Sequence, residues 1–151
     1  MISPQVHSRI LEALTASPLH GRALRQLAMS LLDELPTYNW SGIYRLEGEM
    51  LVLDAYVGAA TDHTHIPVGR GVCGTAVAEN ANQVIEDVRE IANYLACSIQ
   101  TRSEIVVLIR SGETILGQID IDGHTVGAFD DTDESLLEAM AGILANHWTV
   151  N

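Results

Sequence analysis

The chain has 151 residues, 47% of them hydrophobic, which is enough for one well-packed core and too few for two ordinary domains. Eight basic and twenty acidic side chains give a formal net charge of −12, which repels phosphate backbones and anionic lipid. No stretch approaches the ~20 apolar residues that span a bilayer, and no basic segment precedes an apolar run at the start. We therefore expect one cytoplasmic domain, residues 1–151, that binds neither nucleic acid nor membrane.

The first 35 residues show the apolar spacing of two helices, with a break near Pro18 and an end before Pro36. The positions at helical intervals are Val6, Ile10, Leu11 and Leu14 in the first helix and Leu24, Leu27, Leu31 and Leu32 in the second. Residues 1–35 are thus predicted to form an N-terminal helical segment.

From Tyr38 the apolar period changes to two, which is typical of strands. Turn residues at Glu47–Gly48 and at Ser111–Gly112 divide four strands into two hairpins. In the last strand one face carries Ile115, Gly117, Ile119 and Ile121, and the other carries Leu116, Gln118, Asp120 and Asp122. The second face could be a solvated outer surface or a buried polar row.

Between the hairpins the pattern is irregular. Residues 58–70 and 87–103 lack periodicity and are predicted as loops, the second with at most a helical turn near 91–95. One or two helical turns are expected at 71–80, and a short strand at 83–86. Two long loops in a small domain are typical of binding or catalysis.

A final helix over 131–148 begins at a capping-box pattern, Asp131 with Glu134 three residues later. The whole pattern predicts an α+β fold: an antiparallel sheet of five or six strands, with the sheet and its loops in 38–122, flanked by N- and C-terminal helices.

Gly69, Gly71 and Gly74 match the G-x-G-x-x-G pattern of dinucleotide sites. That motif requires a buried strand before the glycines and a full helix after them within a parallel β-α-β unit. Neither is expected here, so we predict no cofactor and read the glycines as tight backbone bends. His63 and His65 form an H-x-H pair in a loop, which is too weak a signal to predict a metal site.

Two cysteines, Cys73 and Cys97, stand 24 positions apart without C-x-x-C spacing, so neither a zinc ribbon nor a disulfide-rich scaffold is indicated. They are either inert core residues or reactive thiols.

Four segments carry more specific information: "NWSGIY" at 39–44, "IPVGRGVCGTA" at 66–76, "LACSIQTRSEIVV" at 95–107 and "GQIDID" at 117–122. With them the chain resembles a GAF domain over nearly its whole length. More narrowly, it resembles the small free-standing GAF proteins that reduce free methionine-(R)-sulfoxide. In that family these segments line one pocket, with the sheet as its floor.

The resemblance implies that Cys97 is the catalytic nucleophile and Cys73 its recycling partner. The reverse assignment stays open, because Cys73 lies near a predicted helix N-terminus, which favours a thiolate. The implied product is a cysteine sulfenic acid, which a second thiol converts to a disulfide that thioredoxin or a similar dithiol reduces. Two departures from the family pattern are His63, where a further cysteine is common, and Ser98, where an aspartate often follows the second cysteine.

Glu104, Asp120 and Asp122 match the family's pocket acids. Asp120 and Asp122 lie about 7 Å apart on one strand face, close enough for crowding and burial to keep one of them protonated. That carboxyl would protonate the sulfoxide oxygen, and an ionised neighbour would hold the substrate's ammonium group. Trp40 is expected to form an apolar wall, and Arg102 to orient an acid or pair with the substrate carboxylate.

The sequence thus favours a thiol-dependent reductase that acts on free methionine sulfoxide, with a homodimer as a further expectation. The alternative is a non-catalytic GAF module that binds a small ligand or senses oxidation through its two thiols. A third hypothesis is a domain that serves only dimerisation, since the terminal helices commonly pair in GAF proteins.

Overall fold

The computed structural model describes residues 1–95 and 98–150. The described residues form four α-helices, one 3₁₀ turn and six strands. In chain order these are α1 (Pro4–Ala16), α2 (Gly21–Leu32), β1 (Trp40–Glu47), β2 (Met50–Val57), β3 (His65–Pro67), α3 (Gly71–Glu79), β4 (Gln83–Ile85), η1 (Val88–Glu90), β5 (Ser103–Ser111), β6 (Thr114–Gly123) and α4 (Asp131–Asn146). None of the helices in this part of the chain is both long enough and apolar enough to cross a bilayer.

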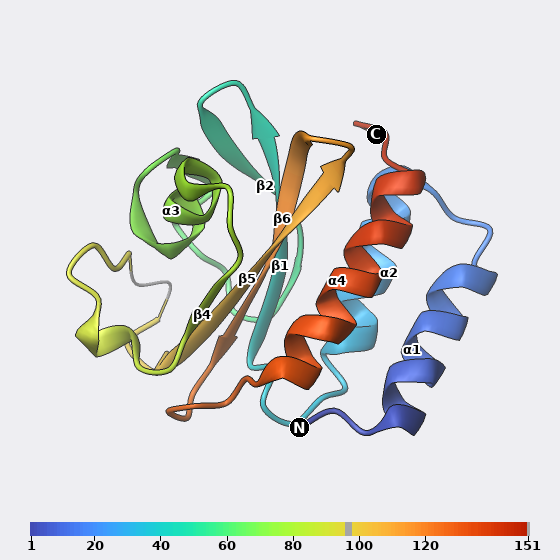
Figure 1. Cartoon of the computed structure of the whole chain (residues 1–151), viewed down its shortest axis with the longest axis horizontal. Coiled ribbons are helices and arrows are strands. Elements are labelled where there is room, and N and C mark those ends of the chain that lie inside the picture. The colour runs from blue at the N-terminus through green and yellow to red at the C-terminus, as the bar shows by residue number, and fades with distance from the viewer. Residues whose placement is uncertain (96–97, 151) are drawn as a thin grey trace.

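All six strands belong to one antiparallel sheet with the order β3-β2-β1-β6-β5-β4. The two hairpins, β1–β2 and β5–β6, meet where β1 pairs with β6. Helices α2 and α4 cover one face of the sheet, with α1 packed against these two helices, and α3 lies on the other face (Figure 1). This arrangement confirms the predicted α+β class and the antiparallel sheet flanked by N- and C-terminal helices.

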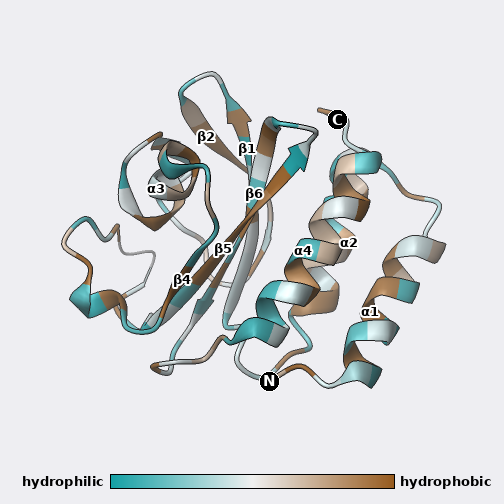
Figure 2. Ribbon diagram, viewed as in Figure 1, coloured by the Kyte–Doolittle hydropathy of each residue, from teal (hydrophilic) through white to brown (hydrophobic). Residues whose placement is uncertain are grey.

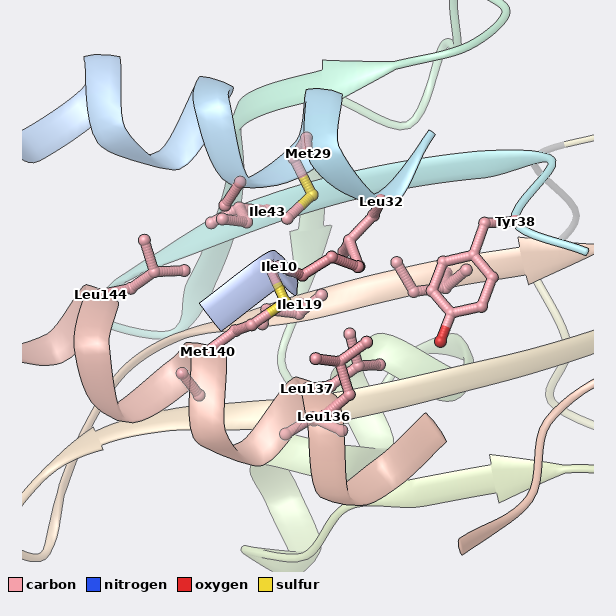
Figure 3. Packing of buried hydrophobic residues seen from close by; sticks show 14 of the residues in the cluster. Ile10, Met29, Leu32, Tyr38, Ile43, Ile119, Leu136, Leu137, Met140 and Leu144 are labelled. Carbon is pink, nitrogen blue, oxygen red and sulfur yellow. The ribbon is translucent and has the colours of Figure 1, made fainter. Parts of the chain in front are cut away.

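The larger hydrophobic core lies between the sheet and the three helices on its first face. Ile43 and Ile119 from the sheet meet Met29 of α2 and Met140 of α4, and Ile10 reaches the same space from α1 (Figure 3). Much of β5 is hydrophobic, whereas the first turn of α4 is hydrophilic (Figure 2). Both faces of the central sheet are covered, because a second hydrophobic cluster lies under α3.

The second cluster fills the space between the sheet and α3. Its sheet residues include Tyr44 on β1 and Val106 on β5, and α3 contributes Val72, Cys73 and Ala76. Because all five are at most 5% exposed, the start of α3 is fixed firmly over the middle of the sheet.

Several element boundaries differ from the sequence prediction. Segment 58–70, predicted as loop, contains the three-residue strand β3, which pairs with β2. The 3₁₀ turn forms at Val88–Glu90, before the predicted 91–95. In α4 the cap is Asp130, whose side chain accepts from the backbone of Thr132, and its capping-box partner is Asp133. Because several acidic residues are close together here, two capping-box pairs fitted the sequence, Asp130 with Asp133 and Asp131 with Glu134. The observed cap is one residue earlier than the predicted one. The helix ends at Asn146.

Strict alternation also fails at two bulges. In the β5–β6 ladder Ile109 pairs with Gly117 and Arg110 with Ile115, so Leu116 has no partner opposite it. Leu116 therefore packs against the helix-side core and Ile115 against the α3 side, which reverses their predicted faces.

A similar bulge falls in β2, where Ile43 pairs with Ala55 and Tyr44 with Leu53, leaving Asp54 as the extra residue. Its carboxylate meets the Arg25 guanidinium of α2, with Nε to Oδ2 at 2.5 Å. Arg45 donates to the other oxygen of Asp54 at 2.9 Å. Arg25 and Asp54 are 1% and 5% exposed, so this ion pair is part of the interior.

Arg25 also fastens the C-terminal segment. Its Nη1 donates to the Thr149 carbonyl at 2.7 Å, and its guanidinium lies 4.4 Å from the centroid of the Trp148 ring. One buried cation thus joins α2, β2 and the residues after α4.

Replacing Arg25 with alanine should leave the Asp54 carboxylate buried without its principal partner. We expect Arg25→Ala to lower the free energy of unfolding by about 3 to 5 kcal/mol, as measured by urea denaturation. Arg9→Ala is the matched control, because the Arg9–Glu34 pair has both side chains more than half exposed. It should cost less than about 1 kcal/mol. Equal, small losses in the two variants would contradict the structural role of Arg25.

Candidate functional site

A row of polar side chains runs along β6 on the face opposite Ile119 and Ile121. Gln118, Asp120 and Asp122 are 0%, 0% and 1% exposed, so the row is buried beneath α3 and its neighbouring loops. The interpretation as a solvated outer face is therefore wrong. Burying two carboxyl groups side by side is costly unless they are protonated or bound, which marks this row as a candidate site.

Backbone pairing sets which residues lie beside each acid. Asp122 stands opposite Glu104 of β5 on one side and Trp40 of β1 on the other. Asp120 stands opposite Val106 and Gly42 in the same way. Residues directly opposite in a sheet project to the same face, so Glu104, Asp122 and Trp40 form one line across the site.

The glycine-rich stretch brings Cys73 to this face. Gly69 and Gly71 adopt φ values of +92° and +65°, which allow the sharp entry into α3 predicted from the sequence. Cys73 is the third residue of that helix and is 5% exposed. Its Sγ donates a weak hydrogen bond to Glu104 Oε2 at 3.8 Å.

Cys73, Glu104 and Asp120 form a compact group. One ligand-type atom from each lies within 4.8 Å of the other two, and all three residues are buried. The group joins α3, β5 and β6, which are far apart in sequence. Of the residues that the structure describes, these three are the side chains grouped closely enough to hold a metal ion; His63 and His65 are not among them.

Burial raises the pKa of Asp120 above its ordinary value of 3.8, because the ionised form loses its hydration. Glu104 and Cys73, which can donate a proton toward this carboxylate, offset part of the effect. Neither oxygen of Asp120 has a partner at normal hydrogen-bond geometry among the described residues. Asp120 is thus the acid of the row that is best suited to carry a proton at neutral pH.

Trp40 forms the other end of the site. Its indole lies across Gly42, where a Cβ would fall 2.3 Å from the ring, and stacks on Tyr56 with centroids 5.8 Å apart. The ring nitrogen donates to the Ala59 carbonyl at 3.0 Å. Trp40 and Asp122 line a cavity of about 80 Å³ together with residues of both long loops.

A smaller cavity of about 10 Å³ adjoins Cys73 and Glu104. Leu95 lines this cavity, and Ser98 lines the larger one beside Trp40. Cys97, predicted as the nucleophile, lies outside the described residues. The structure therefore brings Cys73, Glu104, Asp120, Asp122 and Trp40 onto one face of the sheet.

Arg102 lies at the edge of this face. Its guanidinium donates to the carbonyls of Ile99 and Thr101, at 2.9 and 3.1 Å, and so braces the loop that precedes β5. It forms no ion pair with a pocket acid in the described part of the chain, and its predicted contact with a substrate carboxylate stays a prediction.

Two buried polar residues of the site received no role from the sequence. Both amide atoms of Gln118, and the hydroxyl of Thr101 beside the larger cavity, have no hydrogen-bond partner among the described residues. The alternation of β6 already placed Gln118 on the acid face, so its position could be foreseen. Nothing local marks Thr101, whose burial depends on how the loop folds back.

Comparison with known proteins places the fold. A family model described as GAF domain matches residues 21–148, which include the whole sheet and α4. The chain therefore belongs to the GAF domain family.

Within this family, several relatives carry the same name. The free methionine-R-sulfoxide reductase of Escherichia coli is 43% identical over 114 residues, covering 76% of this chain and 68% of its own. A Staphylococcus aureus structure, fRMsr in complex with substrate, is 34% identical with a TM-score of 0.84 and covers 99% of both chains. The type II free methionine-R-sulfoxide reductase of Thermoplasma acidophilum is 38% identical with a TM-score of 0.80, covering 91% and 93%. Among GAF proteins, the chain belongs with the free methionine-R-sulfoxide reductases.

The raised pKa of Asp120 predicts a specific pH dependence of stability. Above 3.8 the unfolded carboxyl ionises while the folded one keeps its proton, so the native state binds more protons. The free energy of unfolding should then fall as pH rises, by up to about 1.4 kcal/mol per unit, until the folded carboxyl ionises too.

Urea denaturation across this pH range tests that prediction. Asp120→Asn should lack the decrease in the free energy of unfolding that Asp120 causes. The stability of this variant relative to wild type should therefore increase as pH rises. Asp33→Asn, which changes an exposed carboxyl at the end of α2, should follow the wild-type slope. Parallel curves for wild type and Asp120→Asn would show that Asp120 ionises normally in the folded protein.

Proposed function

We propose that this protein is a thiol-dependent enzyme that reduces free L-methionine-(R)-sulfoxide to methionine. The observation that carries the proposal is the Cys73 thiol beside two buried carboxyl groups, Glu104 and Asp120, on the floor of the site. Relatives named for this activity, two of whose structures are described as complexes with substrate, support the same assignment.

The reaction needs a nucleophile for sulfur and a proton for oxygen. In the proposed cycle the thiolate of Cys97 attacks the sulfoxide sulfur, and the sulfoxide oxygen takes a proton from Asp120. The S–O bond breaks as the oxygen passes to the cysteine, giving methionine and a sulfenic acid on Cys97. Asp120 suits the acid role, because burial raises its pKa.

Substrate binding is assigned to the part of the site around Trp40 and Asp122. Trp40 offers an apolar wall for the methyl and thioether groups. Ionised Asp122 and Glu104 would hold the ammonium group, and Arg102 the carboxylate. The cavity beside Trp40 and Asp122, which measures about 80 Å³, is the assigned entry point for the amino acid.

Recycling uses the second thiol. Cys73 attacks the sulfenic acid, releases water and forms the Cys73–Cys97 disulfide, which thioredoxin or a similar dithiol reduces. Cys73 lies on the site floor, and Leu95 and Ser98, on either side of residues 96–97, line the two cavities. With His63 at the position of the family's further cysteine, these two thiols have to complete the cycle.

The proposal extends to the whole chain as one GAF domain, residues 1–151, acting as a cytoplasmic homodimer. A reducing compartment fits a cycle that begins with two thiols.

An assay with separate sulfoxide diastereomers tests the function. With dithiothreitol or a thioredoxin system, the R form of free methionine sulfoxide should be consumed and the S form should not. Cys97→Ser should abolish turnover, and Asp120→Asn should lower kcat roughly 100-fold or more, because it removes the proton donor.

Asp33→Asn changes an exposed residue at the end of α2, which covers the opposite face of the sheet, and should keep the wild-type kcat. Failure of the wild type to consume the R form faster than Cys97→Ser would overturn the proposed reaction. A protein that forms a reversible disulfide or binds a ligand without turnover would instead be a non-catalytic GAF module.

A further inference from the structure

The thiol and two acids of the site floor have the arrangement of a metal-binding group. Cys73 Sγ lies 3.8 Å from Glu104 Oε2, and one Asp120 oxygen lies within 4.8 Å of both of these residues' ligand atoms. Each side chain comes from a different element, so the group is held by the packing of α3 on β5 and β6 and not by one flexible loop.

Asp120 supplies an independent indication that something is to be bound here. Its side chain is fully buried, and neither carboxylate oxygen has a hydrogen-bond partner at normal geometry among the described residues. Its nearest polar neighbours in the group, Cys73 and Glu104, are acids themselves. A buried carboxylate surrounded by other acids is stabilised either by a proton or by a cation.

A small cavity adjoins two of the three proposed ligands. The cavity beside Cys73 and Glu104 measures about 10 Å³, which is room for one water-sized species. Zn–S and Zn–O bonds in a tetrahedron place ligand atoms about 3.4 to 3.6 Å apart. The Cys73–Glu104 pair is already close to this separation, and the others need to close by about 1 Å. Arg70 lines the same cavity, but its side chain is exposed and can turn toward solvent.

We infer that Cys73, Glu104 and Asp120 form a reversible binding site for a zinc-type divalent cation, with water as the fourth ligand. Sulfur with two carboxylates selects Zn²⁺ or Co²⁺, whereas Mg²⁺ and Ca²⁺ prefer six or more oxygen ligands. As the metal binds, the Cys73 thiol and the protonated Asp120 carboxyl each release a proton to solvent, because both groups ligate metal only when deprotonated.

Metal occupancy has a consequence for catalysis, and this part rests on the proposed function. A Cys73 thiolate bound to metal cannot attack a sulfenic acid, and a bound Asp120 carboxylate has no proton to give. Zinc should therefore inhibit the reductase reversibly, and a chelator should restore its activity. The binding itself requires no enzymatic activity.

The test is titration of the reduced protein with Zn²⁺ alone by calorimetry and with Co²⁺ alone by absorption spectroscopy. Wild type and Cys97→Ser should each bind one ion, with a sulfur-to-cobalt charge-transfer band and tetrahedral visible bands. Cys73→Ser should lose the band, and Asp120→Asn should weaken affinity at least about 10-fold.

Asp122→Asn is the matched control, because it removes a buried carboxylate from the same face of β6 outside the group. It should keep metal binding, as should His65→Ala in the H-x-H pair. Circular dichroism of each variant confirms folding, and Glu104→Gln gives a second removal of a ligand.

Binding that persists in Cys73→Ser, that is lost in Cys97→Ser or His65→Ala, or that shows no sulfur band would overturn the inference. If zinc binds as described but no sulfoxide is reduced, the site stands and the proposed function fails.

Discussion

Strand β6 lies between β1 and β5 in the sheet, and helices cover both faces of the sheet. The side chains on both faces of β6 are therefore buried, whether they are apolar or charged. Its helix-side face is apolar, with Ile119 and Ile121, and it adds to the large core. Its other face carries two carboxyl groups and an amide at full burial. The energetic cost of that polar row is met by the rest of the fold, because buried carboxyl groups are unfavourable unless they are protonated or bound.

The elements around the row determine what it can do. The glycine bends before α3 hold Cys73 against Glu104, while the close approach allowed by Gly42 lets the Trp40 indole lie flat across the sheet beside Asp122. Proton donor, thiol and apolar wall thus meet on one face of the sheet, each held on a helix or a strand. The same closeness of sulfur and carboxylates that suits sulfoxide reduction also suits a zinc-type ion, so one arrangement explains both proposals.

Local periodicity was sufficient to predict both hairpins, the helices and the shared face of Asp120 and Asp122. It could not predict that this face is buried, because alternating acids occur equally on solvated sheets. The bulge that turns Asp54 toward Arg25 depends on a partner 29 residues away, and the contact of Cys73 with Glu104 spans 31 residues. Such contacts leave no periodic signal, and the three-residue strand β3 is too short to produce one. The motif resemblance identified the thiols and acids. The structure added the burial of Cys73, Glu104, Asp120 and Asp122 and the elements that hold these four in place.

In the proposed cycle Cys73 and Cys97 act in sequence within one chain. Reduced protein can be mixed with an equal amount of methionine-(R)-sulfoxide, without external dithiol, and analysed by mass spectrometry of its peptides. The proposed cycle predicts one methionine formed per chain and an intramolecular Cys73–Cys97 disulfide. In Cys73→Ser, it predicts a sulfenic acid on Cys97 that a dione reagent traps. Methionine formed while both thiols stay reduced, or a sulfenic acid trapped on Cys73 in Cys97→Ser with methionine released, would contradict it.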